Sequence, residues 1–233
     1  MVVGNGMIAR SFSAYTNRED VVIYASGVSN SAEDSEDKFQ REIDLIKTCI
    51  EKNVNCLIVY FSTCSVRDKS LTDTKYVKHK LFIEDYIKKH ASSFIIFRLP
   101  IVIGKTDNKF TLFNFFQEKL STNQELFIQK NAYRYLVDVD DVSSVLSQII
   151  DSKNFLNYTI EVTFGESISV LEMVDVMKKA ISSDSKINLV DGGCSYVVDN
   201  SLVERFIYSS KIAISKEYNK EVLKKYLKEK ITI

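Results

Sequence analysis

Short, almost wholly apolar runs alternate with helical patterns in the first part of the chain, and this alternation limits the folds open to it. Residues 21–24, 56–61 and 94–99 are rich in Val, Ile, Tyr and Phe, as strands buried on both faces of a parallel sheet are. Between them, residues 37–52 and 76–90 repeat apolar side chains at spacings of three and four, the period of a helix. This order predicts an α/β fold with a doubly wound parallel sheet, built from βαβ units with right-handed crossovers.

The composition excludes most other architectures. Of 233 residues, 45% are hydrophobic, and 31 basic side chains balance 31 acidic ones. These values describe a soluble globular chain and exclude disorder, collagen and disulfide scaffolds. The balanced charge gives no reason to expect a nucleic-acid partner. No apolar run approaches the roughly 18 to 20 residues of a membrane helix, and no basic segment opens a signal peptide, so we expect a cytoplasmic protein without membrane contact.

Cysteine and histidine usage argues against a metal centre. The four cysteines are scattered without the paired spacing of metal ligands, which fits reduced thiols in a reducing compartment. They are Cys49, Cys56, Cys64 and Cys194. Two histidines are too few for a histidine-rich site, so we expect no metal.

Local signals predict the remaining elements. Residues 1–3 form a very short first strand and residues 8–15 the first helix. After residue 110 the pattern is looser. It predicts a helix over 111–120, a strand over 126–129, a helix with Asp140 or Asp141 as its N-cap, a capping box at Ser169 and Glu172, a turn at Gly192 and Gly193, and a solvated terminal helix over 217–230.

A glycine-rich turn directly follows the first strand. The chain has only seven glycines, yet Gly4 and Gly6 stand in a GxGxxA pattern that ends at Ala9. Such a turn lets the backbone approach a pyrophosphate while the next helix presents free N–H groups, so it fits a dinucleotide; an ordinary strand-to-helix turn is the alternative. No acidic residue ends the second strand, which leaves NAD and NADP both open, and Arg10 or Arg18 could neutralise a 2′-phosphate.

Three polar side chains share the expected ligand edge of the sheet. Tyr76 and Lys80 are four residues apart and so project from one helix face, and Thr63 lies just past the strand 56–61. The carboxyl ends of parallel strands line the ligand crevice, which places Thr63 near the glycine turn. Taken alone, such a Tyr–Lys pair is more often a packed ring beside a solvated ammonium. A phenol, with a pKa of about 10, becomes a useful acid–base group when a cation stabilises its phenolate.

In this order, the motifs resemble the extended branch of the short-chain dehydrogenase/reductase superfamily: the NAD(P)-dependent nucleotide-sugar epimerases, dehydratases and reductases. The glycine turn looks like the family's glycine loop, and segment 21–26 looks like the strand end that lines the cofactor. Segment 61–63 resembles the catalytic Ser/Thr segment, 76–80 the YxxxK helix and 98–104 the following strand and loop. The most specific match is 134–142, which is similar to the family's RDfihVdDv segment.

The resemblance implies a Rossmann-like cofactor-binding core over 1–110. Region 111–233 would complete this core at about 134–160 and form a smaller α/β substrate-binding part. Homodimers are implied through helices 37–52 and 76–90. The implied catalytic residues are Thr63, Tyr76 and Lys80. The implied cofactor contacts are Gly4, Asn5, Gly6, Met7, Ile8, Arg10, Ala25, Ser26, Ser62, Tyr76, Lys80 and Leu99. The implied substrate contacts are Thr63, Thr111, Asn114 and Arg134.

Arg134 is the implied contact to the diphosphate of a nucleotide sugar, because a guanidinium can bind phosphate through two parallel hydrogen bonds. The ordinary alternative is a surface arginine paired with Asp138 or Asp140. In the same way, Thr111 and Asn114 are more often ordinary helix or turn residues than substrate contacts.

Departures from the family pattern narrow the function. The two strands that normally follow the glycine loop are missing, which shortens the adenosine end of the cofactor site. Cys64 and Ser65 follow Thr63 where the dehydratases have Asp-Glu, so dehydration is disfavoured. We expect a 4-keto nucleotide-sugar reductase of polysaccharide biosynthesis that uses NADP or NAD, with Tyr76 as proton donor. A nucleotide-sugar 4-epimerase with tightly bound NAD is the first alternative, and a non-catalytic dinucleotide sensor or scaffold is the second.

Overall fold

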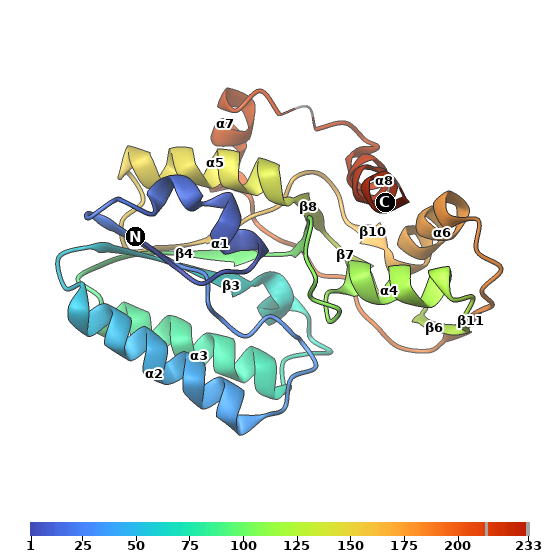
Figure 1. Ribbon diagram of the computed structural model, residues 1–233, viewed down its shortest axis with the longest axis horizontal. Coiled ribbons are helices and arrows are strands. Elements are labelled where there is room, and N and C mark those ends of the chain that lie inside the picture. Colours follow the sequence, from blue (N-terminus) through green and yellow to red (C-terminus); the bar gives the residue numbers. More distant parts are fainter. Residues whose placement is uncertain (213, 232–233) are drawn as a thin grey trace.

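A five-stranded parallel sheet forms the centre of the computed structural model, which describes residues 1–212 and 214–231 (Figure 1). The strands lie in the order β1–β2–β3–β4–β9. They are β1 (Val2–Val3), β2 (Val21–Tyr24), β3 (Leu57–Thr63), β4 (Ser93–Leu99) and β9 (Tyr158–Glu161). All neighbouring pairs are parallel, and Thr63 at the end of β3 lies opposite Leu99 at the end of β4. The carboxyl ends of these strands therefore lie at one edge of the sheet.

Helices cover both faces of this sheet, which confirms the predicted α/β class. Two helices lie on one face and two on the other (Figure 1). The first pair is α2 (Glu36–Lys52) and α3 (Lys75–His90), and the second is α1 (Met7–Ser11) and α5 (Val139–Ser152). Side chains of a strand point alternately to opposite faces. Accordingly Val22 and Tyr24 of β2 pack toward α2 and α3, whereas Val21 and Ile23 pack toward α1 and α5.

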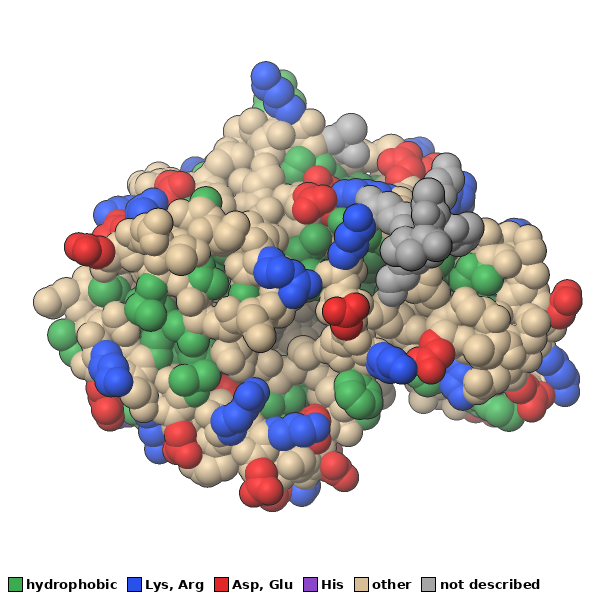
Figure 2. Space-filling model, in the orientation of Figure 1, with side chains coloured by type: hydrophobic (Ala, Val, Ile, Leu, Met, Phe, Trp, Pro, Cys, Tyr) green, Lys and Arg blue, Asp and Glu red, His purple; other side chains and the backbone are tan. Residues whose placement is uncertain are grey.

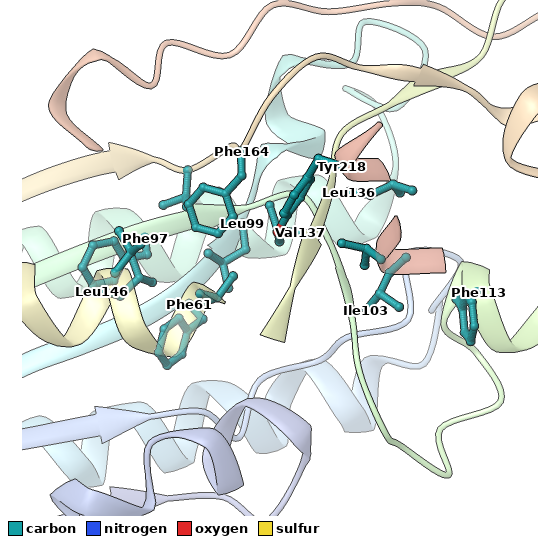
Figure 3. Packing of buried hydrophobic residues seen from close by; sticks show 14 of the residues in the cluster. Phe61, Phe97, Leu99, Ile103, Phe113, Leu136, Val137, Leu146, Phe164 and Tyr218 are labelled. Atoms are coloured by element: carbon teal, nitrogen blue, oxygen red, sulfur yellow. The ribbon is translucent and has the colours of Figure 1, made fainter. Parts of the chain in front are cut away.

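The core on the α1–α5 face is the larger one. Phe61 of β3 and Phe97 of β4 stack 6.3 Å apart, centre to centre, and Leu146 of α5 covers them (Figure 3). The same core continues past the strand ends through Phe164 and Tyr218. One continuous apolar core thus joins the central sheet to the elements beyond it.

The first strand–helix–strand unit, which the sequence did not assign a hand, has the opposite hand to the next two, which are right-handed as expected. The steps from β1 to β2 and from β2 to β3 run in the same direction across the sheet, but α1 and α2 lie on opposite faces. The α2 and α3 crossovers are right-handed, as nearly all such connections are (Figure 1). The α1 crossover is therefore left-handed. A right-handed path through α1 would lead to the other side of β1, where the described chain has no strand.

Strand β1 is consequently an edge strand. Within residues 1–212 and 214–231 it pairs with β2 and with no other strand. This agrees with the predicted absence of the two strands that normally follow the glycine loop. The strand order runs one way without a reversal. In longer open sheets a dinucleotide lies where the order reverses, so here the crevice lacks the wall beyond β1.

A smaller group of elements lies beyond the strand ends (Figure 1, right). Parallel pairing joins β5 to β8 and β6 to β11, and antiparallel pairing joins β7 to β10. The strands are β5 (Ile101–Ile103), β6 (Leu126–Gln129), β7 (Tyr133–Arg134), β8 (Leu136–Asp138), β10 (Ile168–Ser169) and β11 (Ile187–Val190). The helices of this later region are α4 (Leu112–Ser121), α6 (Val170–Ile181), α7 (Ser201–Ser209) and α8 (Tyr218–Ile231). The predicted functional division at residue 110 stays a prediction.

Two local expectations are wrong. The N-cap of α5 is Asp138 and not Asp140 or Asp141, because the Asp138 carboxylate accepts the N–H of Asp140 at 2.8 Å. The predicted helix over 8–15 is split into α1 and a 3₁₀ turn at Ser13–Tyr15. The N-cap bond of the expected capping box is present at the start of α6, where the Ser169 hydroxyl accepts the N–H of Glu172 at 3.0 Å, and the Glu172 carboxylate pairs with Lys220 at 3.4 Å.

The terminal helix α8 packs on the core, whereas the sequence predicted a solvated helix. Its Leu223 is fully buried. The Tyr226 hydroxyl donates to Asp138 at 2.9 Å, and Lys225 reaches the same carboxylate at 2.8 Å. The Tyr218 hydroxyl donates to Asp141 at 2.7 Å. The acidic residues at the start of α5 therefore anchor the last helix.

Membrane spans and metal-binding clusters are both absent from residues 1–212 and 214–231. No helix is long and apolar enough to cross a membrane. No group of His, Cys, Asp and Glu side chains has the arrangement of a metal site. The four cysteines are free thiols.

Candidate active site

The glycine loop packs tightly against the segment that follows β2. Gly4 has a φ of +124°, and a Cβ there would lie 2.5 Å from the carbonyl oxygen of Ala25 and 3.2 Å from the amide nitrogen of Ser26. Gly6 precedes α1, and a Cβ there would meet nothing within 4 Å. Packing therefore requires the glycine at Gly4, whereas the surface above Gly6 is open at a helix N-terminus, as the approach of a phosphate requires.

The arginines near the loop are engaged by the protein. Arg10 donates to the carbonyl oxygens of Asn5 at 2.9 Å and Lys105 at 3.1 Å. Arg18 donates to both oxygens of Asp20, at 2.7 and 2.9 Å. Arg10 thus ties the glycine loop to the loop after β5, and contact of either arginine with a 2′-phosphate stays a prediction.

Thr63 lies at the carboxyl edge of the sheet, and Tyr76 packs against the segments that leave this edge. Thr63 ends β3, and its hydroxyl accepts the N–H of Ser65 at 3.0 Å, which leaves the hydroxyl proton for another acceptor. Tyr76, on α3, is buried in an apolar cluster that contains Val28, which follows β2, and Val66, which follows Thr63. The segments after β2 and β3 therefore enclose the Tyr76 ring.

Lys80 is the predicted site residue whose surroundings differ most from the expectation. Its side chain is 3% exposed. The Nζ atom lies 3.2 Å from Oε1 of Glu42 and 3.0 Å from the Tyr60 hydroxyl. The same atom is 5.9 Å from the centre of the Tyr76 ring. Lys80 therefore stays next to Tyr76, but its ammonium faces a buried carboxylate.

The other predicted cofactor residues lie beneath the surface of this edge. Met7 and Ile8 are half-buried in α1. The Ser62 hydroxyl donates to Glu84 at 2.6 Å, and Leu99 is part of the larger core. Ser62 and Leu99 hold β3 and β4 in place, and direct contact of any of the four with a cofactor stays a prediction.

Arg134 forms an ion pair that the sequence did not predict. Its Nη1 lies 3.1 Å from Oδ2 of Asp68, a fully buried carboxylate in the segment after Thr63. Asp138 and Asp140, the partners considered from the sequence, both bind Lys225 instead, at 2.8 Å. The Arg134 side chain remains 17% exposed. Arg134 therefore lies against the segment after the predicted catalytic residue Thr63, with its charge partly offset.

Thr111 and Asn114 order the loop between β5 and α4. Thr111 is the N-cap of α4 and accepts the N–H of Asn114 at 3.3 Å. The Asn114 amide donates to the carbonyl oxygens of Thr106 and Asn108, both at 2.9 Å. These bonds give both residues a structural role, and their contact with substrate stays a prediction.

Two buried carboxylates at this site escaped the sequence analysis. Glu42 lies on the buried stripe of α2, at helical spacing from Phe39 and Ile46. A carboxylate within an apolar stripe of the sequence could have indicated a buried, paired charge at this position. Asp68 accepts the Cys194 thiol at 2.7 Å. Burial by itself would raise the pKa of Asp68, but hydrogen bonds from Cys194 and Ser70 and the charge of Arg134 lower it. No local pattern marks Asp68, because its partners lie far along the chain.

Comparison with known proteins gives similarity both in sequence and in structure. No family model matches the chain. A CDP-abequose synthase from Salmonella muenchen is 32% identical over 108 residues, which are 44% of this chain and 36% of that protein. The match thus spans about a third of the length of the relative.

Solved structures match over nearly the whole chain. The Bordetella bronchiseptica enzyme WbmH in complex with NAD+ has a TM-score of 0.69 at 20% identity, covering 95% of this chain and 79% of that one. The UDP-glucuronic acid 4-epimerase of Bacillus cereus, in complex with UDP-glucuronic acid and NAD, has a TM-score of 0.69 at 16% identity, covering 94% and 78%. RMD from Pseudomonas aeruginosa, complexed with NADPH, has a TM-score of 0.69 at 12% identity, covering 91% and 82%.

The chain has the α/β fold of these solved structures. The fold that the resemblance implied is therefore confirmed, and the chain is shorter than the solved structures it matches. Figure 2 shows that the surface of this fold is hollowed between the central sheet and the part that carries α4 and α6. Basic and acidic side chains are interspersed over the visible face, without a large patch of one sign.

Proposed function

We propose that the chain is an NAD(P)-dependent oxidoreductase that acts on a nucleotide-activated sugar. More specifically, we propose reduction of a 4-keto sugar with Tyr76 as the proton donor. The observation that carries the proposal is the position of Tyr76: it packs against the segments after β2 and β3, and the Lys80 ammonium lies 5.9 Å from its ring centre. Thr63 ends β3, directly before the second of these segments. The names of the similar proteins support it, because one is a CDP-abequose synthase and another a UDP-glucuronic acid 4-epimerase in complex with NAD.

The residues present fit the central part of a dinucleotide. Gly4 allows the close approach of the loop to Ala25, and the open surface above Gly6 suits the pyrophosphate. Thr63 and Tyr76 suit the nicotinamide end. The adenosine end has less to hold it, because β1 is an edge strand. When bound, the cofactor supplies a hydride to the sugar carbon.

The side chains of the chain would control the proton. The Tyr76 phenol donates its proton to the sugar oxygen as the carbonyl becomes a hydroxyl. The Thr63 hydroxyl donates a hydrogen bond to the same oxygen and orients it. Arg134 is the candidate contact to the diphosphate of the substrate, at the price of weakening its 3.1 Å ion pair with Asp68.

A 4-epimerase is the second candidate, and a specific observation favours it: several of the solved structures with this fold are nucleotide-sugar 4-epimerases. Epimerisation needs a cofactor that stays bound between two half-reactions. We favour reduction because the open edge at β1 suits a cofactor that exchanges at each turnover. A non-catalytic sensor or scaffold is the remaining alternative.

Mixing the protein with NADPH or NADH and a panel of 4-keto nucleotide sugars separates these functions. A reductase oxidises the cofactor with one of the sugars, which near-ultraviolet absorbance follows. An epimerase retains cofactor through purification and converts a sugar without net oxidation. Cofactor binding without turnover of any sugar would contradict both the reductase and the epimerase proposals and would favour the non-catalytic sensor.

Replacing Tyr76 by Phe tests the proton donor directly. We expect turnover to fall about 10²- to 10⁴-fold, the usual contribution of a general acid, with cofactor affinity nearly unchanged. Tyr86→Phe is the matched control, because Tyr86 lies on the same helix but stacks on His90. Full activity of Tyr76→Phe would contradict the assignment.

A further inference from the structure

The ammonium of Lys80 lies in a closed polar cluster. Glu42 is 0% exposed, and both its oxygens are used. Oε1 accepts from the Tyr60 hydroxyl at 2.8 Å and from Lys80 at 3.2 Å. Oε2 accepts from the backbone N–H of Val28 at 2.6 Å and lies 2.9 Å from Nε2 of His79. One carboxylate thus links α2, α3, β3 and the segment after β2.

The backbone after β2 closes directly over this cluster. A Cβ on Gly27 would lie 2.7 Å from Oε1 of Glu42 and 2.7 Å from Nζ of Lys80. Gly27 follows Ala25 and Ser26, the segment on which the glycine loop rests. The position of the glycine loop and that of the catalytic lysine are therefore connected through the Glu42 carboxylate.

Glu42 is ionised at neutral pH. Burial by itself would raise its pKa, but the charge of Lys80 and the hydrogen bonds from His79 and Val28 lower it to about 2. A buried anion beside a buried cation offsets much of the field that the cation exerts on its other neighbours. The nearest such neighbour in the catalytic set is Tyr76, whose ring centre is 5.9 Å from the ammonium.

We propose that Glu42 is a positioning residue of the reaction: it fixes the Lys80 ammonium beside Tyr76 and offsets its charge, so that Tyr76 keeps the proton it donates. The proposal rests on the proposed role of Tyr76 as a proton donor. A fully effective cation would favour the phenolate, which suits a base more than an acid. The anion therefore tunes the pair for reduction.

The elements packed around the cluster contribute few other ionisable groups. Helix α3 contributes His79, and strand β3 contributes Tyr60. Strand β2 contributes Tyr24, whose hydroxyl donates to the backbone oxygen of Glu42 at 3.3 Å. The segment 25–28 has no ionisable side chain. Among these groups, Glu42 is the one that carries negative charge at neutral pH.

The decisive variant is Glu42→Gln, which keeps the size of the side chain and removes its charge. In the reductive direction we expect the alkaline limb of the kcat profile to move to lower pH by about one unit, because the uncompensated cation favours the phenolate. A lower kcat with an unmoved limb would mean a purely structural role and would overturn the proposal.

A titration without substrate separates this proposal from the proposed function. The tyrosinate absorbance of the Glu42→Gln protein, minus that of the Glu42→Gln, Tyr76→Phe double variant, gives the titration of Tyr76 in the absence of the Glu42 charge. The absorbance of the unchanged protein minus that of the Tyr76→Phe variant gives the reference titration with Glu42 present. We expect the isolated titration to move to lower pH by about one unit in the Glu42→Gln background. This shift is expected even if no sugar is turned over; identical titrations would refute the role of Glu42.

Glu84→Gln is the matched control. Glu84 is also 0% exposed and paired with a cation, but the cation is Arg98, at 2.7 Å. We expect Glu84→Gln to leave the Tyr76 titration unmoved, and an equal shift there would overturn the proposal. If Glu42→Gln does not fold, Glu42→Asp replaces it. The shorter Asp side chain holds its carboxylate farther from Lys80, so we expect the Tyr76 titration to move to lower pH by about half as much as in Glu42→Gln. An unmoved Tyr76 titration in Glu42→Asp would refute the proposal.

Discussion

The glycine loop allows a sharp test of which glycine the fold requires. Gly4→Ala adds a methyl group at a φ of +124°, 2.5 Å from the carbonyl oxygen of Ala25 and 2.8 Å from its carbonyl carbon. Both neighbours are backbone atoms, which cannot rotate away as the end of a side chain can. Gly6→Ala adds the same group two residues later, at a φ of −71° and with nothing within 4 Å. The two variants therefore add the same methyl group to the same loop and differ in the backbone conformation and the packing at the substituted position.

The expected cost of Gly4→Ala has two parts. A side chain at this φ costs about 1 to 3 kcal/mol in strain. Relieving the contact with Ala25 costs about 1 to 3 kcal/mol more, the usual range for overpacking. We take about 3 kcal/mol in total, a large share of the roughly 5 to 15 kcal/mol that stabilise a domain. For a chain of this size the melting temperature should fall by about 6 to 12 °C.

Urea denaturation followed by far-ultraviolet circular dichroism measures both variants against the unchanged chain. Gly6→Ala should cost less than about 1 kcal/mol, because its site is the N-cap of a short helix and nothing packs there. A Gly4→Ala protein within about 0.5 kcal/mol of the unchanged chain would refute the reasoning. So would a Gly6→Ala protein that is destabilised as much as Gly4→Ala.

Two further predictions follow from the buried ionisable groups. The free energy of unfolding should decrease as the pH falls from about 5 toward 2. The reason is that the pKa of Glu42 is about 2 in the folded state, below its value of 4.5 in the unfolded state. The ionised carboxylate therefore contributes about 3 kcal/mol of stability above about pH 4.5, and this contribution is lost as the pH falls to about 2. Urea denaturation at stepped pH measures this, and Glu42→Gln should flatten the profile; equally steep profiles would contradict it. At about pH 8 a thiol reagent should modify Cys56 and Cys194 well before Cys49 and Cys64, because burial raises the thiol pKa to about 11 for Cys49 and about 12 for Cys64. Mass spectrometry of the labelled peptides reports the order, and rapid labelling of Cys64 in the native state would be the contrary result.

The central sheet was predictable because its signals are local. The runs 21–24, 56–61 and 94–99 are almost wholly apolar, so they had to be buried. They correspond to β2, β3 and β4 of the structure. The helical stripe over 37–52 is equally local and corresponds to α2. The hand of the first crossover was not predictable from periodicity, since it depends on which neighbour of β1 is missing.

The candidate site was predictable in its residue types but not in its contacts. Tyr76 and Lys80 follow from a spacing of four on one helix, and Thr63 from the end of a strand. The ion pair of Lys80 with Glu42 joins residues 38 positions apart, and that of Arg134 with Asp68 joins strand β7 to the segment after β3. Partners of this kind depend on how the elements pack, which no local pattern records.

The shortening of the sheet and the presence of the candidate site are compatible because they concern different strands of the sheet. Thr63, Tyr76 and Lys80 depend on β2, β3, α2 and α3, whose pairing and right-handed crossovers are complete. The loss of strands affects only β1, which α1 connects to β2 by a left-handed crossover, the rarer hand. An edge strand of two residues leaves few unpaired backbone groups, so it gives little template for aggregation. The terminal amine of Met1 also donates to the carbonyl oxygens of Arg18 and Val21, which ties this edge to the start of β2. The proposed catalytic edge therefore keeps its supporting elements while the wall beyond β1 is absent, and this combination is the reason that we propose a cofactor that exchanges at each turnover.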